Sequence, residues 1–263
     1  MNSIATENLS VAYENNLVVD NLNTQIPRGE ITAIIGPNGC GKSTLLKTLG
    51  RILKPKNGVV YLNGNDIRQL STREIAKKMA ILPQSPLAPA GLTVGELVAY
   101  GRFPYQRGLG KLKPEDKNII DWALAATKLT ELEITAVDNL SGGQRQRVWI
   151  AMALAQQTDL ILLDEPTTYL DLSYQLELLE LLYQLNREQG CTIVMVLHDL
   201  NLAARFADYM VAIRRGTIIR HGSPREVMTA GVLRETFRID ASIITDPRTG
   251  RPTCISYDLI KAE

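Results

Sequence analysis

Three long apolar runs stand out in the hydrophobic and polar pattern of this chain. Residues 31–35 read ITAII, residues 160–163 read LILL and residues 192–197 read TIVMVL. Runs without polar alternation are typical of strands covered on both faces, as in parallel sheets. Each run ends in a polar segment that begins with Gly36, Asp164 or His198. Because open α/β sheets bind ligands beyond the carboxyl ends of their strands, the pattern predicts an α/β fold with a site at that edge.

Shorter segments predict a set of further strands. The first two, at residues 9–13 and 17–19, flank a turn at residues 14–16. A strand at residues 59–62 precedes Asn63-Gly64, which is a hairpin signal, and another strand covers residues 79–82. Residues 209–214 and 217–221 predict a hairpin closed by Arg215-Gly216.

Helical periodicity predicts the remaining elements. The predicted helices are 71–78, 93–100, 115–128, 144–155, a long leucine-rich helix stopped by Gly190, and a short one at 225–228. Between residues 85 and 114 the composition changes, because proline and glycine punctuate the segment and four cations make it locally basic: Arg102, Arg107, Lys111 and Lys113. This segment is either the boundary of an insertion or an ordinary solvated loop.

The segment after the first apolar run is a P-loop. It consists of Gly36, Pro37, Asn38, Gly39, Cys40, Gly41, Lys42, Ser43 and Thr44, and it matches G-x-x-x-x-G-K-[ST]. In this pattern backbone N–H groups surround a phosphate, the lysine reaches the β- and γ-phosphates and the hydroxyl holds Mg²⁺. The strand before it and the helix after it favour this interpretation over a glycine-rich turn that only caps a helix.

The second and third apolar runs deliver ionisable side chains to the same edge. Asp164 is placed to support Mg²⁺. Glu165 comes one residue later, on the opposite side of the pleat, and is a candidate to polarise an attacking water. His198 is either a structural histidine or a contact for the γ-phosphate. A pair of acids at a strand end can also be merely solvated, but the P-loop favours the catalytic interpretation.

Two further features are ambiguous when taken alone. Tyr13 either stacks on adenine or packs on a half-buried strand. The run Ser141, Gly142, Gly143 and Gln144 opens a predicted helix and is either a second phosphate-binding helix start or an ordinary cap.

Composition narrows the class of protein. The 263 residues fit one domain with an insertion, and 45% hydrophobic content is enough for a sizeable core. A net charge of +1 argues against a nucleic-acid partner bound through bulk charge. Cys40, Cys191 and Cys254 have no metal-binding spacing and are predicted to be reduced thiols of a cytosolic protein. Neither a secretory signal nor a membrane-spanning run is visible, so other chains would have to hold the protein at a membrane.

In this order, the motifs resemble those of the ATPase subunits of ABC transporters. The resemblance rests on Tyr13, the P-loop, Gln84, residues 140–144, residues 160–165, Asp171 and His198, and it covers nearly the whole chain. It implies a single domain with a P-loop NTPase core sheet at about 1–85 and 158–240, and an N-terminal antiparallel β part. It also implies an inserted helical subdomain at about 86–157 and a C-terminal extension at about 241–263.

The resemblance also implies roles for the motif residues. ATP would be bound by Tyr13 and the P-loop of one subunit and by residues 141–144 of a second, in a head-to-tail homodimer linked through Asp171. Ser43, Gln84 and Asp164 would hold Mg²⁺. Glu165 would be the general base, and Lys42 and His198 would complete the catalytic set.

Residues 98–104 and 246–252 further resemble the branch that imports iron-siderophores, haem and cobalamin, the ferric dicitrate type and related ferric-siderophore ATPases above all. This implies a peripheral protein at the cytoplasmic face of the membrane. Membrane permeases would dock near residues 85–114, and an extracytoplasmic binding protein would supply the cargo. The alternative is a soluble nucleotide-gated clamp in iron-sulfur assembly or DNA repair, against which the absence of a coiled-coil insertion argues.

Overall fold

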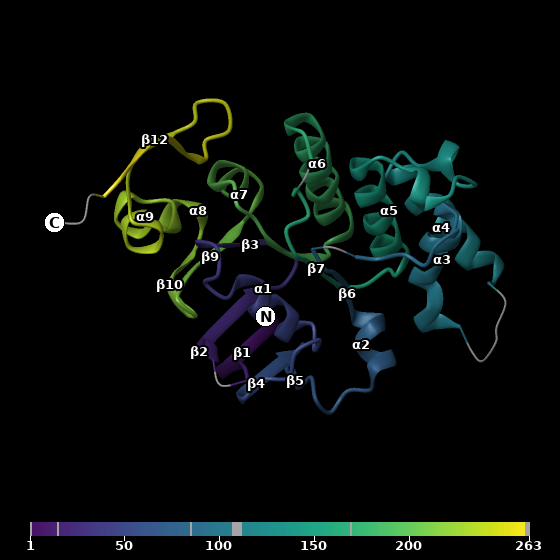
Figure 1. Cartoon of the computed structure of the whole chain (residues 1–263), viewed down its shortest axis with the longest axis horizontal. Coiled ribbons are helices and arrows are strands. Elements are labelled where there is room, and N and C mark those ends of the chain that lie inside the picture. Colours follow the sequence, from purple (N-terminus) through teal and green to yellow (C-terminus); the bar gives the residue numbers. More distant parts are fainter. Residues whose placement is uncertain (1, 15, 85, 107–111, 169, 261–263) are drawn as a thin grey trace.

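The protein is built around a six-stranded sheet (Figure 1). The computed structural model describes residues 2–14, 16–84, 86–106, 112–168 and 170–260. The strand order is β10-β9-β3-β8-β7-β6, in which only the β9–β10 pair is antiparallel. The bounds are β3 (Ile31–Ile35), β6 (Met79–Leu82), β7 (Leu160–Leu163), β8 (Thr192–Val196), β9 (Tyr209–Arg214) and β10 (Thr217–Gly222). The predicted α/β class with buried parallel strands is confirmed.

The central strands send alternate side chains into two separate cores, as the period of a strand requires. Ile31, Ala33 and Ile35 of β3 pack into one core, and Ile34 packs into the other. The first core lies against the helices α5 (Gly142–Ala155), α6 (Leu172–Gln189) and α7 (Leu200–Phe206), and the second against α1 (Lys42–Leu49) and the N-terminal strands. Figure 1 shows these two layers on opposite sides of the sheet. Because both faces are covered, the strands carry no polar alternation.

The N-terminal strands form a four-stranded antiparallel sheet of order β2-β1-β4-β5. Their bounds are β1 (Asn2–Tyr13), β2 (Asn16–Pro27), β4 (Asn57–Leu62) and β5 (Asn65–Asp66). The predicted strands at 9–13 and 17–19 were therefore much too short. The register of β1 against β2 shifts at several places, between Thr6 and Leu9 among others. Such bulges interrupt the alternation on which a prediction from sequence depends.

The predicted helices are present with small changes at their ends. Beside α1, α5 and α6 they are α2 (Thr72–Lys78), α3 (Val94–Ala99), α4 (Pro114–Ala126) and α8 (Pro224–Val227). Short 3-10 turns η1 (Tyr100–Tyr105), η2 (Thr130–Leu132) and η3 (Val137–Asn139) connect α3, α4 and α5 into one helical layer. This layer, in teal in Figure 1, is the inserted helical part of the predicted fold class.

One of the four cations predicted to make residues 85–114 basic belongs to the core of the helical layer. Arg102 is 5% exposed and lies 2.8 Å from the carboxylate of Asp116 in α4. Burial acts to raise the pKa of Asp116, but the bonds and charges of Arg102 and Lys113 together outweigh it and hold that pKa below its usual value. The prediction that Arg102 contributes to a basic surface was therefore wrong. Lys113 is exposed, and Arg107 and Lys111 lie outside the described residues.

The C-terminal region contains elements that the sequence pattern did not predict: α7, α9 (Ala230–Phe237), β11 (Ile239–Thr245) and β12 (Pro252–Leu259). The last two strands pair as a separate hairpin. The Asn201 side chain attaches this hairpin to α7, because it both accepts from and donates to the backbone of Cys254, at 2.8 and 3.0 Å. Cys40, Cys191 and Cys254 are buried and form no disulfide, as predicted. Within the described part of the chain, every helix is too short or too polar to cross a membrane.

Candidate nucleotide-binding site

Residues 36–41 connect the central strand β3 to α1 through conformations that glycine favours. Gly36 has φ +154°, and a Cβ placed there would lie 2.2 Å from the carbonyl oxygen of Ile213. Gly41, at φ +105°, is the N-cap of α1 and gives the helix no side-chain cap. The first N–H groups of α1 therefore have no capping side chain, which makes this helix start a natural position for an anion.

Lys42 is held over the loop by the loop itself. Its side chain is buried, and Nζ donates to the carbonyl oxygens of Gly36 at 2.8 Å and Pro37 at 3.0 Å. Neither partner is charged, and among the described residues no carboxylate forms an ion pair with this ammonium, which lies beside the open helix start. A bound phosphate would find the lysine already in place.

Ser43 and Asp164 bring the P-loop and the end of β7 together. Ser43 Oγ donates to Asp164 Oδ1 at 2.8 Å. Asp164 is 1% exposed, and its Oδ2 has no hydrogen-bond partner among the described residues. Burial raises the pKa of Asp164, against the opposing bond from Ser43. An unpartnered buried carboxylate oxygen next to a hydroxyl fits a site for a hard cation such as Mg²⁺.

The carboxylate of Glu165 lies at the centre of a network of polar side chains. Oε1 lies 2.7 Å from His198 Nε2, and Oε2 accepts from Gln84 Nε2 at 2.6 Å and from Thr168 Oγ1 at 3.2 Å. The strand β7 ends at Leu163, so the prediction that it continues and places Glu165 across the pleat was wrong. Glu165 instead has φ +52°, and this left-handed turn directs its side chain toward β6 and β8.

These side chains enclose one hollow of about 360 Å³, which we call the P-loop hollow. Its lining residues are Val18, Asn38, Gly39, Gly41, Lys42, Ser43, Thr44, Gln84, Glu165 and His198. Tyr13 lies at its border, half exposed, with its hydroxyl 3.5 Å from Thr44 Oγ1. Gly36 and Pro37 hold Lys42 through their carbonyl oxygens, and Cys40 is buried.

Sequence reasoning missed two residues of this site. Val18 lines the P-loop hollow from β2, and Thr168 binds Glu165 from the turn after β7. Nothing in the pattern distinguishes Val18 from other strand valines. Thr168 had a weak signal, because it follows the two acids and Pro166 in a segment too polar to continue the strand.

The second glycine-containing helix start lies outside this hollow. Ser141 is the N-cap of α5, its Oγ accepts from Gln144 N at 3.3 Å, and both residues are exposed. Gly142 has open space on the side where a Cβ would lie, and Gly143 approaches only Leu170. Asp171 is the N-cap of α6 and is also exposed. In the part of the chain that the structure describes, none of these residues lines the P-loop hollow.

A P-loop whose lysine, hydroxyl and buried aspartate converge beyond a parallel sheet defines a nucleotide-binding P-loop ATPase. Residues 19–168 match the family described as ABC transporter, and the chain belongs to this family. Over its full length it is 60% identical to the iron(3+)-hydroxamate import ATP-binding protein FhuC of Bacillus subtilis (strain 168), of which it covers 98%. It is therefore the ATP-binding subunit of an ABC transporter.

Solved structures agree with this assignment. A transporter described as of metal-chelate type, in an inward-facing conformation, superposes with a TM-score of 0.83 at 30% identity, over 97% of this chain and 96% of that one. A dimeric post-hydrolysis state of the ATP-binding cassette MJ0796, bound to ADP and Pi, gives a TM-score of 0.75 at 32% identity, over 84% of this chain and 98% of the other.

Proposed function

We propose that this protein binds and hydrolyses ATP to drive import of a ferric siderophore through membrane permeases. The observation that carries the proposal is the position of Glu165, whose carboxylate is held by Gln84 and His198 at the border of the P-loop hollow. A carboxylate held there faces the space beyond Lys42, where the terminal phosphate of ATP would lie. This is the position that a base for hydrolysis requires.

ATP binding would use parts that are already in place. The open N–H groups at the start of α1 and the Lys42 ammonium would receive the phosphates, and Tyr13 would stack on the base. Ser43, Gln84 and Asp164 would hold Mg²⁺, and the unpartnered Oδ2 of Asp164 supports this assignment. The ion would neutralise charge on the phosphates during hydrolysis.

Hydrolysis would depend on Glu165 as general base. Its carboxylate would accept a proton from the attacking water, while His198 would hold the carboxylate and contact the γ-phosphate. The amide of Gln84 donates to the same carboxylate, so a movement of the segment after β6 would be felt directly at the base. Gln84, beside its role at Mg²⁺, would in this way also report the state of the nucleotide site to a partner.

A second copy of the chain would complete the site. Ser141, Gly142 and Gln144 are exposed, and none of residues 141–144 lines the P-loop hollow of its own chain, which is open to the outside. A head-to-tail homodimer would bring residues 141–144 of one subunit onto the nucleotide of the other, with Asp171 between the two sites. The dimeric form of the similar cassette MJ0796 supports this proposal.

The permease would dock on the segment that follows β6. Leu87 is 91% exposed and Phe103 is 70% exposed, although both are large and apolar. Two such side chains near Gln84 in sequence are typical of a surface covered by a partner. Polytopic permeases would hold the ATPase as a peripheral protein at the cytoplasmic face of the membrane, and an extracytoplasmic binding protein would deliver the cargo.

The cargo class follows from the relatives rather than from any residue of the site. The relative at 60% identity is named for iron(3+)-hydroxamate, so a ferric hydroxamate siderophore is the first cargo to test, ahead of ferric dicitrate. The soluble clamp is the weaker alternative, because the matched relative and the metal-chelate type structure are both parts of transporters.

Uptake of radiolabelled iron as a ferric hydroxamate, in cells that lack the gene, tests the proposal. The wild-type gene should restore uptake, and Glu165→Gln should not restore it although the protein accumulates to the same level. Uptake of an amino acid serves as the control for the energy state of the cells. Full uptake with Glu165→Gln, or no recovery with the wild type for any ferric siderophore, would contradict the proposal.

A further inference from the structure

We infer that Glu177 is a positioning residue that fixes the start of α5, with residues 141–144, relative to the start of α6, with Asp171. This inference rests on the proposed function, in which residues 141–144 act on the nucleotide of a second subunit. Glu177 is on the second turn of α6 and outside the P-loop hollow. It touches none of the reacting groups and would act only through the helix that it holds.

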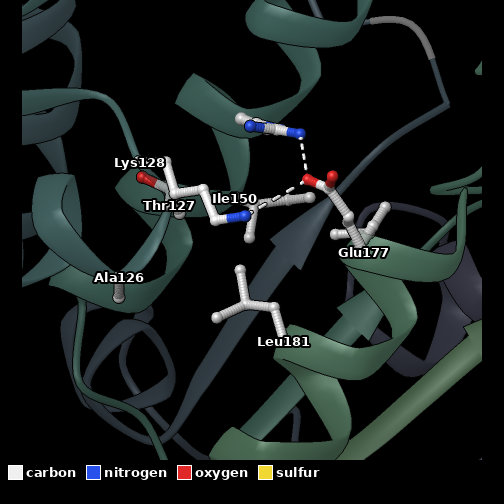
Figure 2. A pocket seen from close by; sticks show the side chains of 8 residues that line it. Ala126, Thr127, Lys128, Ile150, Glu177 and Leu181 are labelled. Atoms are coloured by element: carbon white, nitrogen blue, oxygen red, sulfur yellow. Dashed lines mark hydrogen bonds and ion pairs between the residues drawn. The ribbon is translucent and has the colours of Figure 1, made fainter. Parts of the chain in front are cut away.

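A single carboxylate connects two helices of the helical layer to the core. Glu177 Oε2 lies 2.6 Å from the guanidinium of Arg147 on α5 and 3.5 Å from Nζ of Lys128, which follows α4. Figure 2 shows the carboxylate of Glu177 reaching across toward the ammonium of Lys128. Two cations on one anion give a cluster with a net positive charge, so removal of the anion leaves repulsion as well as a lost bond.

The contacts around this cluster make the position of Arg147 specific. Its guanidinium lies 5.1 Å from the ring centroid of Tyr174, and its side chain is only 21% exposed. Beneath the ion pairs, Ile150, Leu178 and Leu181 line a small gap of about 40 Å³ between the helices. The apolar packing between the helices is incomplete at this gap, so the charged cluster contributes to the alignment of α5 on α6.

The same two helices also meet at their N-terminal ends. Gln146 Nε2 donates to the carbonyl of Pro166 at 3.1 Å, and the position for a Cβ on Gly143 lies 3.5 Å from Leu170. Arg147 is three residues from Gln144, so a shift at the Glu177 cluster moves residues 141–144 directly. Since the backbone of α5 packs mainly on α3 and α4, these side-chain contacts carry much of its attachment to α6.

The test compares Glu177→Gln with Glu180→Gln, an exposed glutamate one turn further along the same helix. ATPase rate is measured against protein concentration, and binding of a fluorescent ATP analogue is measured separately. Since a partly exposed ion pair is weak but acts twice in a dimer, Glu177→Gln should raise the protein concentration for half-maximal specific activity by roughly threefold to tenfold. The affinity for the analogue should not change, and Glu180→Gln should behave like the wild type.

The double variant Arg147→Glu with Glu177→Arg provides the rescue. If the charges position α5, the protein concentration for half-maximal specific activity should be closer to the wild-type value in the double variant than in either single variant. Identical behaviour of Glu177→Gln and the wild type would overturn the inference while leaving the proposed function intact. A wild type whose rate is strictly proportional to concentration, in a proven monomer, would instead overturn the dimer on which both rest.

Discussion

Helices α1 and α5 both have glycine at their start, yet their first turns are built differently. The N-cap of α1 is Gly41, which provides no side-chain bond, and the residue that follows is the buried Lys42. The N-cap of α5 is Ser141, which forms a capping box with Gln144, and both residues are exposed. The first helix start is therefore incomplete without an anion, whereas the second is complete without one.

The difference shows how one chain could carry a phosphate-binding helix start and a second one, proposed to act only on a partner's nucleotide, without competition between them. The start of α1 faces the P-loop hollow, which is also lined by Val18 of β2 and by the residues that follow β6, β7 and β8. Its uncapped N–H groups are therefore directed at this hollow. The start of α5 is open to the outside, and its own cap keeps it folded until a partner approaches. Each of the following experiments either removes this contrast or makes it measurable.

The largest effect is expected at the carboxylate beside the first helix start. Glu165→Gln keeps the shape of the side chain and its contact with His198 but removes the base, so hydrolysis should fall by about 10²–10⁴-fold. ATP binding should persist, because Lys42 and the loop are unchanged. Rapid-quench measurement of turnover, with binding of a fluorescent ATP analogue in parallel, checks both. Wild-type turnover would show that Glu165 is not the base.

Glycine-to-alanine substitutions compare the two helix starts directly. Gly36→Ala would place a methyl group 2.2 Å from the carbonyl oxygen of Ile213, so the free energy of unfolding should fall by about 2–4 kcal/mol. The methyl group of Gly142→Ala would meet none of the described residues within 4 Å, its own helix and chain neighbours aside, and should change stability by less than about 0.5 kcal/mol. Urea denaturation monitored by circular dichroism measures both values.

The activity of Gly142→Ala then separates the interpretations of the second helix start. If a nucleotide of a partner subunit approaches this backbone, the variant should be stable yet slow in hydrolysis. Normal turnover in a stable Gly142→Ala protein would indicate that the open space beside Gly142 is ordinary surface.

A buried charge makes the first site pH-sensitive. The pKa of Asp164 is raised by burial, so the folded protein holds a proton that the unfolded chain would release. Its ionisation therefore costs stability as the pH rises from the ordinary aspartate value near 4 through the raised value. Asp164→Asn should be more stable than the wild type at pH 7 and equal to it below that window. Thermal unfolding across pH 3–8 follows the difference.

The same substitution should lower the rate of hydrolysis although it raises stability. Asp164→Asn should lose roughly 10–100-fold in hydrolysis, as is typical when a metal-supporting carboxylate is neutralised. Stabilisation of the folded protein by ATP with Mg²⁺, over ATP alone, should shrink in the same variant. A variant that is less stable at pH 7, or that responds to Mg²⁺ like the wild type, would contradict the assignment of Asp164.

The sequence predicted the first helix start almost completely and the second only as a resemblance. Gly36, Lys42, Ser43 and Asp164 follow from rules that connect residue type to phosphate and cation chemistry, and the parallel strands that bring them together follow from unbroken apolar runs. Ser141 and Asp171 have no such local rule. Their proposed roles depend on a second chain, which neither periodicity nor spacing within one chain can reveal.

Other failures have local causes. The bulged hairpin of β1 and β2 interrupts the alternation, so its true length was not predicted. The left-handed turn at Glu165 was missed because glutamate rarely adopts it, and the turn is imposed by the network with Gln84 and His198. Arg102 was assigned to the surface because its partner, Asp116, lies 14 residues away, beyond the reach of composition.

The smallest expected effect distinguishes a structural cap from a functional hydroxyl. Ser141 and Ser71 form the same capping box, at the starts of α5 and α2. Replacement of either serine by alanine should cost about 0.5–1 kcal/mol in the free energy of unfolding, since each removes one acceptor for a helix N–H group. Only Ser141→Ala should also raise the protein concentration for half-maximal ATPase activity, because only α5 is proposed to face a second nucleotide. Equal stability losses with equal, unchanged ATPase rates would reduce Ser141 to a cap, and the contrast between the two helix starts would then be one of stability alone.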